Sequence, residues 1–205
     1  MRFSIRVFLL IMSVVALVVA LTVSLRERTG ASAGTPPAVP AAIQVPAGNT
    51  LFLVGHATGT QDYVCLPAGD GVKFVLVTPQ ATLVSDGAQV TSHYFSPNPA
   101  EGGTIRATWQ NTRDTSTVWA EAKPGNLSAD PAFVAPGAIP WVLLTRAGTQ
   151  AGPDGGDALT QTTFVQRLNT VGGVAPTTGC SSSADVGHQA FAPYTADYFF
   201  YKQAP

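Results

Sequence analysis

The chain has 205 residues, of which 45% are hydrophobic and only 11% are charged, and its formal net charge is −1. No run of like charge occurs anywhere along it, whereas a protein that binds nucleic acid through the phosphates needs clustered Lys and Arg. The composition therefore argues against a nucleic-acid partner.

The first predicted element is an export segment within residues 1–33. Arg2 and Arg6 precede an uncharged apolar run, Val7–Leu25, and Ala31–Ala33 supplies a small-x-small cleavage pattern. The run is close to the roughly 20 residues that cross a bilayer, so an uncleaved membrane anchor is the alternative to a cleaved signal peptide. Either way, we expect the rest of the chain to be secreted, periplasmic or on the cell surface. The membrane is an expected partner only if the segment stays uncleaved.

A Pro/Ala/Gly-rich stretch follows in residues 34–48. It has no charge and neither helical nor strand periodicity, which predicts a semi-rigid linker. Residues 49–205 have the usual size of a single domain. From Gly34 onward seven Lys or Arg stand against eleven Asp or Glu, a formal charge of −4. We therefore expect one weakly acidic domain.

Short β-branched and aromatic runs recur in that domain between Gly, Pro, Asn and Asp, and helical periodicity is nearly lacking. The pattern predicts an all-β domain, a sandwich or a barrel of about ten short antiparallel strands. The expected strands are 51–55, 61–65, 72–78, 81–85, 91–95, 104–110, 117–121, 141–146, 162–169 and 196–201. The long connections at 123–140 and 147–159 are places where binding sites are common.

Alternation indicates which residues of the late strands share a face. Over 162–168, Phe164, Gln166 and Leu168 point one way and Val165 and Arg167 the other. The last strand places aromatic side chains on both faces, as Tyr198 and Phe200 oppose Phe199 and Tyr201. The aromatic side chains on both faces can be buried only if this strand is central in the fold or is covered by a loop.

The two cysteines, Cys65 and Cys180, both lie in the exported part. In an oxidising compartment they are expected to form a disulfide. A reactive thiol is the alternative, although no C-x-x-C spacing supports it.

Six stretches resemble a known family, the exported domain of unknown function 3455. They are GHATGTQDYVC (55–65), HYFSPNP (93–99), ATWQ (107–110), AIPWVLL (138–144), FVQRLNTVGGVAPTTGC (164–180) and PYTADYFFY (193–201). The resemblance implies export and brings no established activity. Some fungal members are labelled malate dehydrogenase, but no G-x-G-x-x-G opens a helix after a strand here, so an NAD-dependent dehydrogenase is not expected.

No motif specific to one reaction occurs. The histidines His56, His93 and His188 lack metal-ligand spacing, and G-x-S-x-G is missing. We therefore name no catalytic residue, metal ligand or cofactor. An extracytoplasmic enzyme, a hydrolase or a metal-dependent protein with a site at His56, His93 and Asp62, is kept as an alternative.

The most distinctive polar group is Arg167 and Asn169, with Asp197 on the last strand. An Arg–Asp pair across adjacent strands is usually a structural ion pair. In the functional interpretation, Arg167 presents its guanidinium to a carboxylate or a sugar hydroxyl, with Asn169 as second donor.

Trp109 lies near a strand end and could stack an exposed ring against a sugar, or pack in the core. Our leading hypothesis is a non-catalytic β domain that binds a small molecule, a glycan or an envelope component, with the candidate ligand-binding residues Trp109, Arg167, Asn169, Asp197, His56 and His93. A structural or stress-related surface protein is a further alternative.

Overall fold

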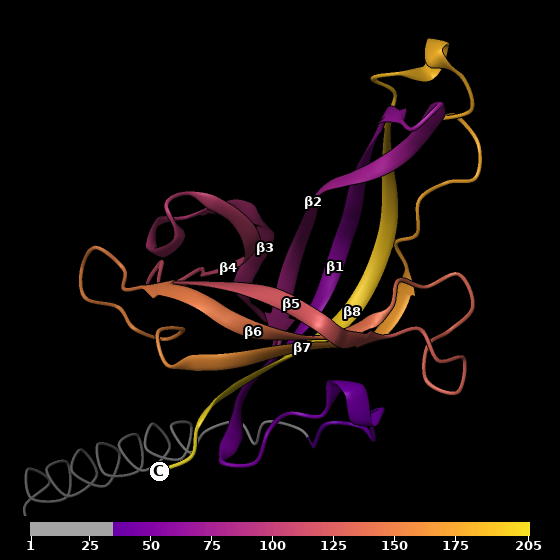
Figure 1. Cartoon of the computed structure of the whole chain (residues 1–205). Coiled ribbons are helices and arrows are strands. Elements are labelled where there is room, and N and C mark those ends of the chain that lie inside the picture. The colour runs from indigo at the N-terminus through magenta and orange to yellow at the C-terminus, as the bar shows by residue number, and fades with distance from the viewer. Residues whose placement is uncertain (1–34) are drawn as a thin grey trace, which may run out of the picture. The chain divides into compact units, whose positions relative to one another are not determined.

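The computed structural model describes residues 35–205, and this part of the chain is a closed antiparallel β-barrel (Figure 1). Each strand pairs with the next along the chain, and β8 returns to β1. The strands are β1 (Asn49–Ala68), β2 (Gly71–Ser85), β3 (Ala88–Asn98), β4 (Thr104–Asn111), β5 (Thr117–Ser128), β6 (Trp141–Gln150), β7 (Thr162–Gly172) and β8 (Gln189–Gln203). Three short 3₁₀ turns, η1 (Ala41–Ile43), η2 (Pro99–Glu101) and η3 (Ser183–Asp185), complete it.

The all-β prediction is confirmed, whereas the sandwich alternative and the number of ten strands are wrong. Two pairs of expected strands are single long strands, because neither Gly59 in β1 nor Pro79 in β2 interrupts the ladder. Gly59 permits a close approach, since an added Cβ would lie 1.9 Å from the Gln80 carbonyl oxygen. Pro79 pairs with β1 alone, since pairing with β3 begins at Ala81, so its missing N–H costs no bond on that side.

The barrel interior holds the main core. Val142 and Leu144 of β6, Val165 of β7, and Tyr198 and Phe200 of β8 belong to one buried cluster. The loop 151–161 adds Leu159, which is fully buried there and whose N–H donates to Ser116 Oγ at 3.1 Å. The inward side chains thus follow the alternation expected from the sequence.

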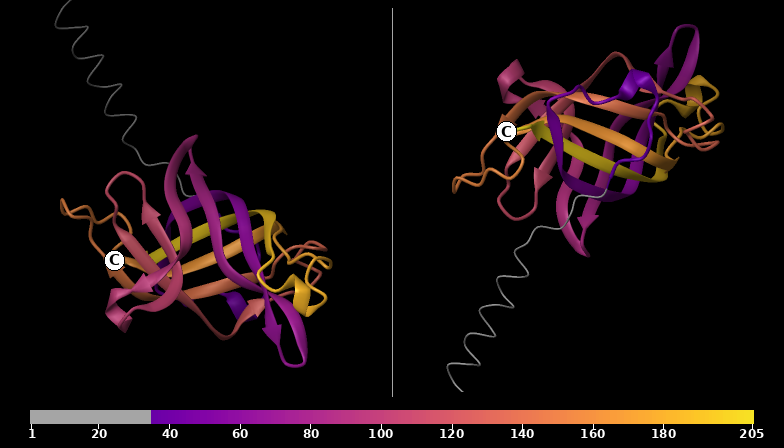
Figure 2. Two further views of the ribbon diagram at one scale, coloured as in Figure 1. Left: turned by 90° about the horizontal axis from the view of Figure 1, so that it is seen from above. Right: turned by 90° about the horizontal axis from the view of Figure 1, so that it is seen from below.

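A second apolar cluster covers the outer face of β6, β7 and β8. Leu143, Leu168, Phe199 and Tyr201 pack there against Ile43 of η1, which is fully buried. Figure 2 shows the N-terminal segment, in indigo, crossing the orange and yellow strands on this face. The segment predicted to be a linker therefore docks on the barrel, and it buries the second set of β8 aromatics, as that strand's pattern required.

The disulfide prediction is confirmed. Cys65 of β1 is bonded to Cys180, 115 positions later, with 5.4 Å between their Cα atoms. Cys65 also donates its N–H to the His188 carbonyl at 2.8 Å and accepts from Gly187 N–H at 2.9 Å. The loop between β7 and β8 is thereby fixed to β1 in the part of the barrel that extends beyond the other strands (Figure 1).

Within residues 35–205 there is no helix long and apolar enough to cross a membrane. The signal peptide or anchor expected in residues 1–33 lies outside the described residues.

Candidate functional site

The barrel encloses a cavity of about 310 Å³, which is room for on the order of ten waters. Its lining comes from all eight strands. The lining residues are Gln61, Leu76, Pro79, His93, Phe95, Ile105, Arg106, Ala107, Trp109, Ala120, Glu121, Ala122, Leu127, Val142, Leu144, Arg167 and Tyr198. Barrels of eight strands are just wide enough to be filled by side chains or to hold one small ligand, and this one is filled only in part.

Small side chains and a strand separation leave the space. Ala107, Ala120 and Ala122 line the cavity where larger residues could have filled it. The backbone pairing of β4 with β5 also ends at Ala107 and Ala120, after four residue pairs. Beyond this point Ile105 and Leu127 lie on the lining with more than half of their surface exposed. The cavity thus opens to solvent past an apolar edge.

Three buried hydrogen-bond donors on the lining have no partner. They are Gln61 Nε2, Trp109 Nε1 and Arg167 Nε. The hydroxyl of Tyr194 lies near Gln61 and that of Tyr198 near Arg167, without satisfying these two donor atoms. Gln61 is 2% exposed and Trp109 is not exposed at all. Because a buried donor without a partner costs about 1–3 kcal/mol, such groups are rare in native proteins. Three of the five such atoms in residues 35–205 lie on this one cavity, which indicates that a hydrogen-bond acceptor belongs there.

Arg167 is a half-buried cation on the cavity lining. Its Nη2 donates to the Pro140 carbonyl at 2.9 Å, and no carboxylate of residues 35–205 lies within ion-pair distance of it. Its neighbours are tyrosines: burial raises the pKa of Tyr63, Tyr194 and Tyr198, while the charge of Arg167 acts in the opposite sense on each. All three phenols are neutral at pH 7, so none of them offsets the charge of Arg167.

His93 adds a neutral polar wall. Its Nδ1 donates to the Thr108 carbonyl at 2.9 Å, and its ring stacks on Trp109 with 4.3 Å between centroids. Burial lowers the pKa of His93 to about 3, so it does not carry charge at neutral pH. Tyr198 packs against both rings, at 5.1 Å from His93 and 5.5 Å from Trp109.

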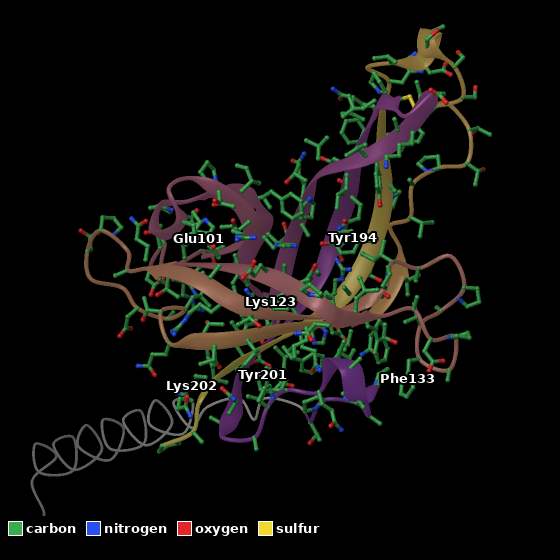
Figure 3. All side chains as sticks on the ribbon, in the orientation of Figure 1. Glu101, Lys123, Phe133, Tyr194, Tyr201 and Lys202 are labelled. Atoms are coloured by element: carbon green, nitrogen blue, oxygen red, sulfur yellow. A yellow bond between two sulfur atoms is a disulfide. The ribbon has the colours of Figure 1, made fainter. Side chains whose placement is uncertain are left out.

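The charged residues at the opening neutralise one another. Arg106 forms a two-point contact with Glu101, at 2.8 Å from Nε and 2.7 Å from Nη2. Its Nη1 lies 2.9 Å from Glu121, which also pairs with Lys123. These two cations and two carboxylates bridge the place where β4 and β5 part, and Figure 3 labels Glu101 and Lys123 there.

The expected ion pair of Arg167 with Asp197 is wrong. In the register of β7 and β8, Leu168 faces Asp197 and Arg167 faces Tyr198, so the two charged side chains point to opposite sides of the wall. Asp197 binds His56 Nδ1 at 2.6 Å and Asn169 Nδ2 at 2.8 Å on the outside. Asn169, with a φ of 51°, therefore cannot be a second donor beside Arg167.

The structure keeps Arg167, His93 and Trp109 together on the cavity and separates them from His56, Asn169 and Asp197. Trp109 is fully buried, so the exposed stacking platform is not formed. In residues 35–205 no three His, Cys, Asp or Glu side chains come close enough to hold a metal ion. Asp62 is instead held by Thr60 and Gln80.

Sequence reasoning missed Gln61 and the tyrosines Tyr63, Tyr194 and Tyr198. Strand parity could have found two of them, since Tyr194 and Tyr198 are four residues apart on β8 and so share the inward face. Their hydroxyl oxygens lie 3.3 Å apart. Figure 3 labels Tyr194 beside the middle part of β8 and Tyr201 nearer its C-terminal end, and Tyr201 belongs to the outer cluster.

Comparison with known protein families gives a match over most of the chain. The family model described as a protein of unknown function (DUF3455) matches residues 46–202, well over half of the chain. No curated protein and no solved structure matches.

Proposed function

The chain belongs to the family of proteins of unknown function DUF3455, and from that premise and the barrel geometry we propose that it binds a small, largely apolar molecule inside the barrel. The observation that carries the proposal is the cavity of about 310 Å³ with unpartnered buried donors on its wall. Binding cavities are typically apolar with a few polar groups that orient the ligand. The lumen has this composition, since Leu144, Val142 and Trp109 line it together with Gln61 and Arg167.

The binding is proposed to occur outside the cytoplasm. The Cys65–Cys180 disulfide is consistent with an oxidising compartment. A barrel fixed by a disulfide and a docked N-terminal segment suits a carrier or a sensor of small molecules in such a compartment. This proposal replaces the glycan platform, because Trp109 offers no exposed ring.

Isothermal titration of the purified full-length protein with a panel of small apolar compounds tests the proposal. The diagnostic variant is Ala107→Trp, which fills the lumen from β4. Its matched control is Ala158→Trp, at an exposed position that is not on the lining. We expect compounds that bind the protein and the control to lose binding to Ala107→Trp. Binding that survives Ala107→Trp in a folded variant would come from elsewhere on the chain and would contradict the proposal.

A further inference from the structure

We propose that the ligand is a small monoanion, an aliphatic or aromatic monocarboxylate, whose anionic end lies at Arg167 and whose apolar end fills the rest of the lumen. The inference rests on the proposed function and adds the class of ligand. It depends on the chemistry of the groups that lack partners, on the charge balance of the lumen and on the shape of its wall.

The fully buried side-chain atoms without partners on the lining are donors. They are Gln61 Nε2, Trp109 Nε1 and Arg167 Nε. A ligand that is itself a donor, such as an amine or an ammonium ion, leaves them unpaired and meets the positive charge of Arg167. A carboxylate is acceptor-only and offers about four lone-pair sites, so it matches the set.

The charge of Arg167 favours an anionic ligand over a neutral hydrogen-bond acceptor. Arg167 has no carboxylate of residues 35–205 within ion-pair distance, and its tyrosine neighbours and His93 are neutral. By contrast, Arg106 at the opening is matched with Glu101 and Glu121. The lining around Arg167 therefore lacks one negative charge, while the charges around Arg106 are balanced. Hydrogen bonds between ionised partners are about twice as strong as neutral ones.

The remaining wall limits the ligand to one charge. Val142, Leu144, Phe95 and Ile105 line the same cavity as Arg167. A second carboxylate on the ligand would lie against these apolar side chains or near Glu121, at a desolvation cost that nothing on the wall offsets. An apolar tail instead buries its surface there.

The test is a titration with matched compounds that differ only at the polar end. The probes are octanoate, octanamide and 1-octanol, and 3-phenylpropionate with its amide and its alcohol. They are titrated at pH 7.5 into the full-length protein, Arg167→Gln, Arg167→Lys and the control Arg113→Gln, which alters an exposed arginine. Chemical denaturation of each variant establishes that it is folded.

We expect each carboxylate to bind the protein about tenfold or more tightly than its amide or alcohol. Arg167→Gln removes this preference by weakening the carboxylate alone. Arg167→Lys retains part of it, and Arg113→Gln retains all of it. Equal binding of acid, amide and alcohol, abolished by Ala107→Trp, overturns the anion inference and leaves the proposed function standing. Failure of all six probes to bind the folded protein contradicts both.

Discussion

The buried histidine makes the stability of the barrel depend on pH in a window that can be calculated. Burial lowers the pKa of His93 to about 3 from its ordinary 6.5. Between these two pH values His93 is protonated in the unfolded chain but neutral in the folded one. The free energy of unfolding therefore falls as the pH drops below 6.5 toward 3. At pH 7.5 His93 is neutral in both states. At pH 5 it is mostly protonated in the unfolded state and still neutral in the barrel.

The size of the effect follows from the two pKa values. Between pH 7.5 and pH 5, this residue alone lowers the free energy of unfolding by about 2 kcal/mol. The window lies above the range in which carboxylates contribute. For example, Arg106 and Asn98 lower the pKa of Glu101 to about 2, and the stability held by such groups is lost mainly below about pH 5.

This fall in the free energy of unfolding is measured by urea denaturation of the protein and of His93→Asn, each at pH 7.5 and at pH 5. Asparagine keeps a donor for the Thr108 carbonyl but does not titrate, so we expect lower stability at both pH values and a drop between them that is smaller by about 2 kcal/mol. The matched control, His188→Asn, removes an exposed histidine and keeps the larger drop. An equal drop in the protein and in His93→Asn would refute the burial of a neutral histidine in the lumen.

Three further predictions concern the parts that hold the barrel. Replacing Cys65 and Cys180 together by Ala frees a loop of 115 positions and lowers the free energy of unfolding by about 5 kcal/mol in the chain-entropy account; a loss under 1 kcal/mol in urea denaturation would contradict it. Ile43→Ala opens a void under the docked N-terminal segment and costs about 3 kcal/mol, checked by the same assay, and unaltered stability would show that the segment does not pack. Asn169→Ala costs about 1 kcal/mol in thermal denaturation because of its left-handed backbone, while Asn169→Gly costs less; the reverse order would contradict that conformation.

Local patterns were enough to predict the all-β class and which residues of β7 and β8 share a face. Alternation correctly separated Val165 and Arg167 from Phe164, Gln166 and Leu168. The same logic could not count the strands, because Gly59 and Pro79 carry the composition of a turn while their neighbours on β1 and β2 continue the ladder. A proline interrupts a strand only where its missing N–H faces a neighbouring strand. Which edge faces a neighbour is known only once the sheet is assembled.

The candidate site was only partly predictable for a similar reason. Arg167 and Asp197 lie on adjacent strands, but a register offset of one residue turns them to opposite faces. The register between β7 and β8 depends on two bulges, one between Thr162 and Phe164 and one between Leu168 and Val171. No local sequence pattern predicts these bulges. That donor atoms of Gln61, Trp109 and Arg167 have no hydrogen-bond partner can likewise be recognised only in the folded barrel.

The indole N–H resonances of the protein test the central claim most directly. Trp109 Nε1 has no partner in the lumen, whereas Trp119 Nε1 already donates to Ser96 Oγ at 2.9 Å. In a ¹⁵N-labelled sample titrated with octanoate, we predict a saturable shift of the Trp109 indole signal, as it gains an acceptor, and an unmoved Trp119 signal. Saturable binding of octanoate that leaves the Trp109 signal in place would contradict a ligand in the barrel.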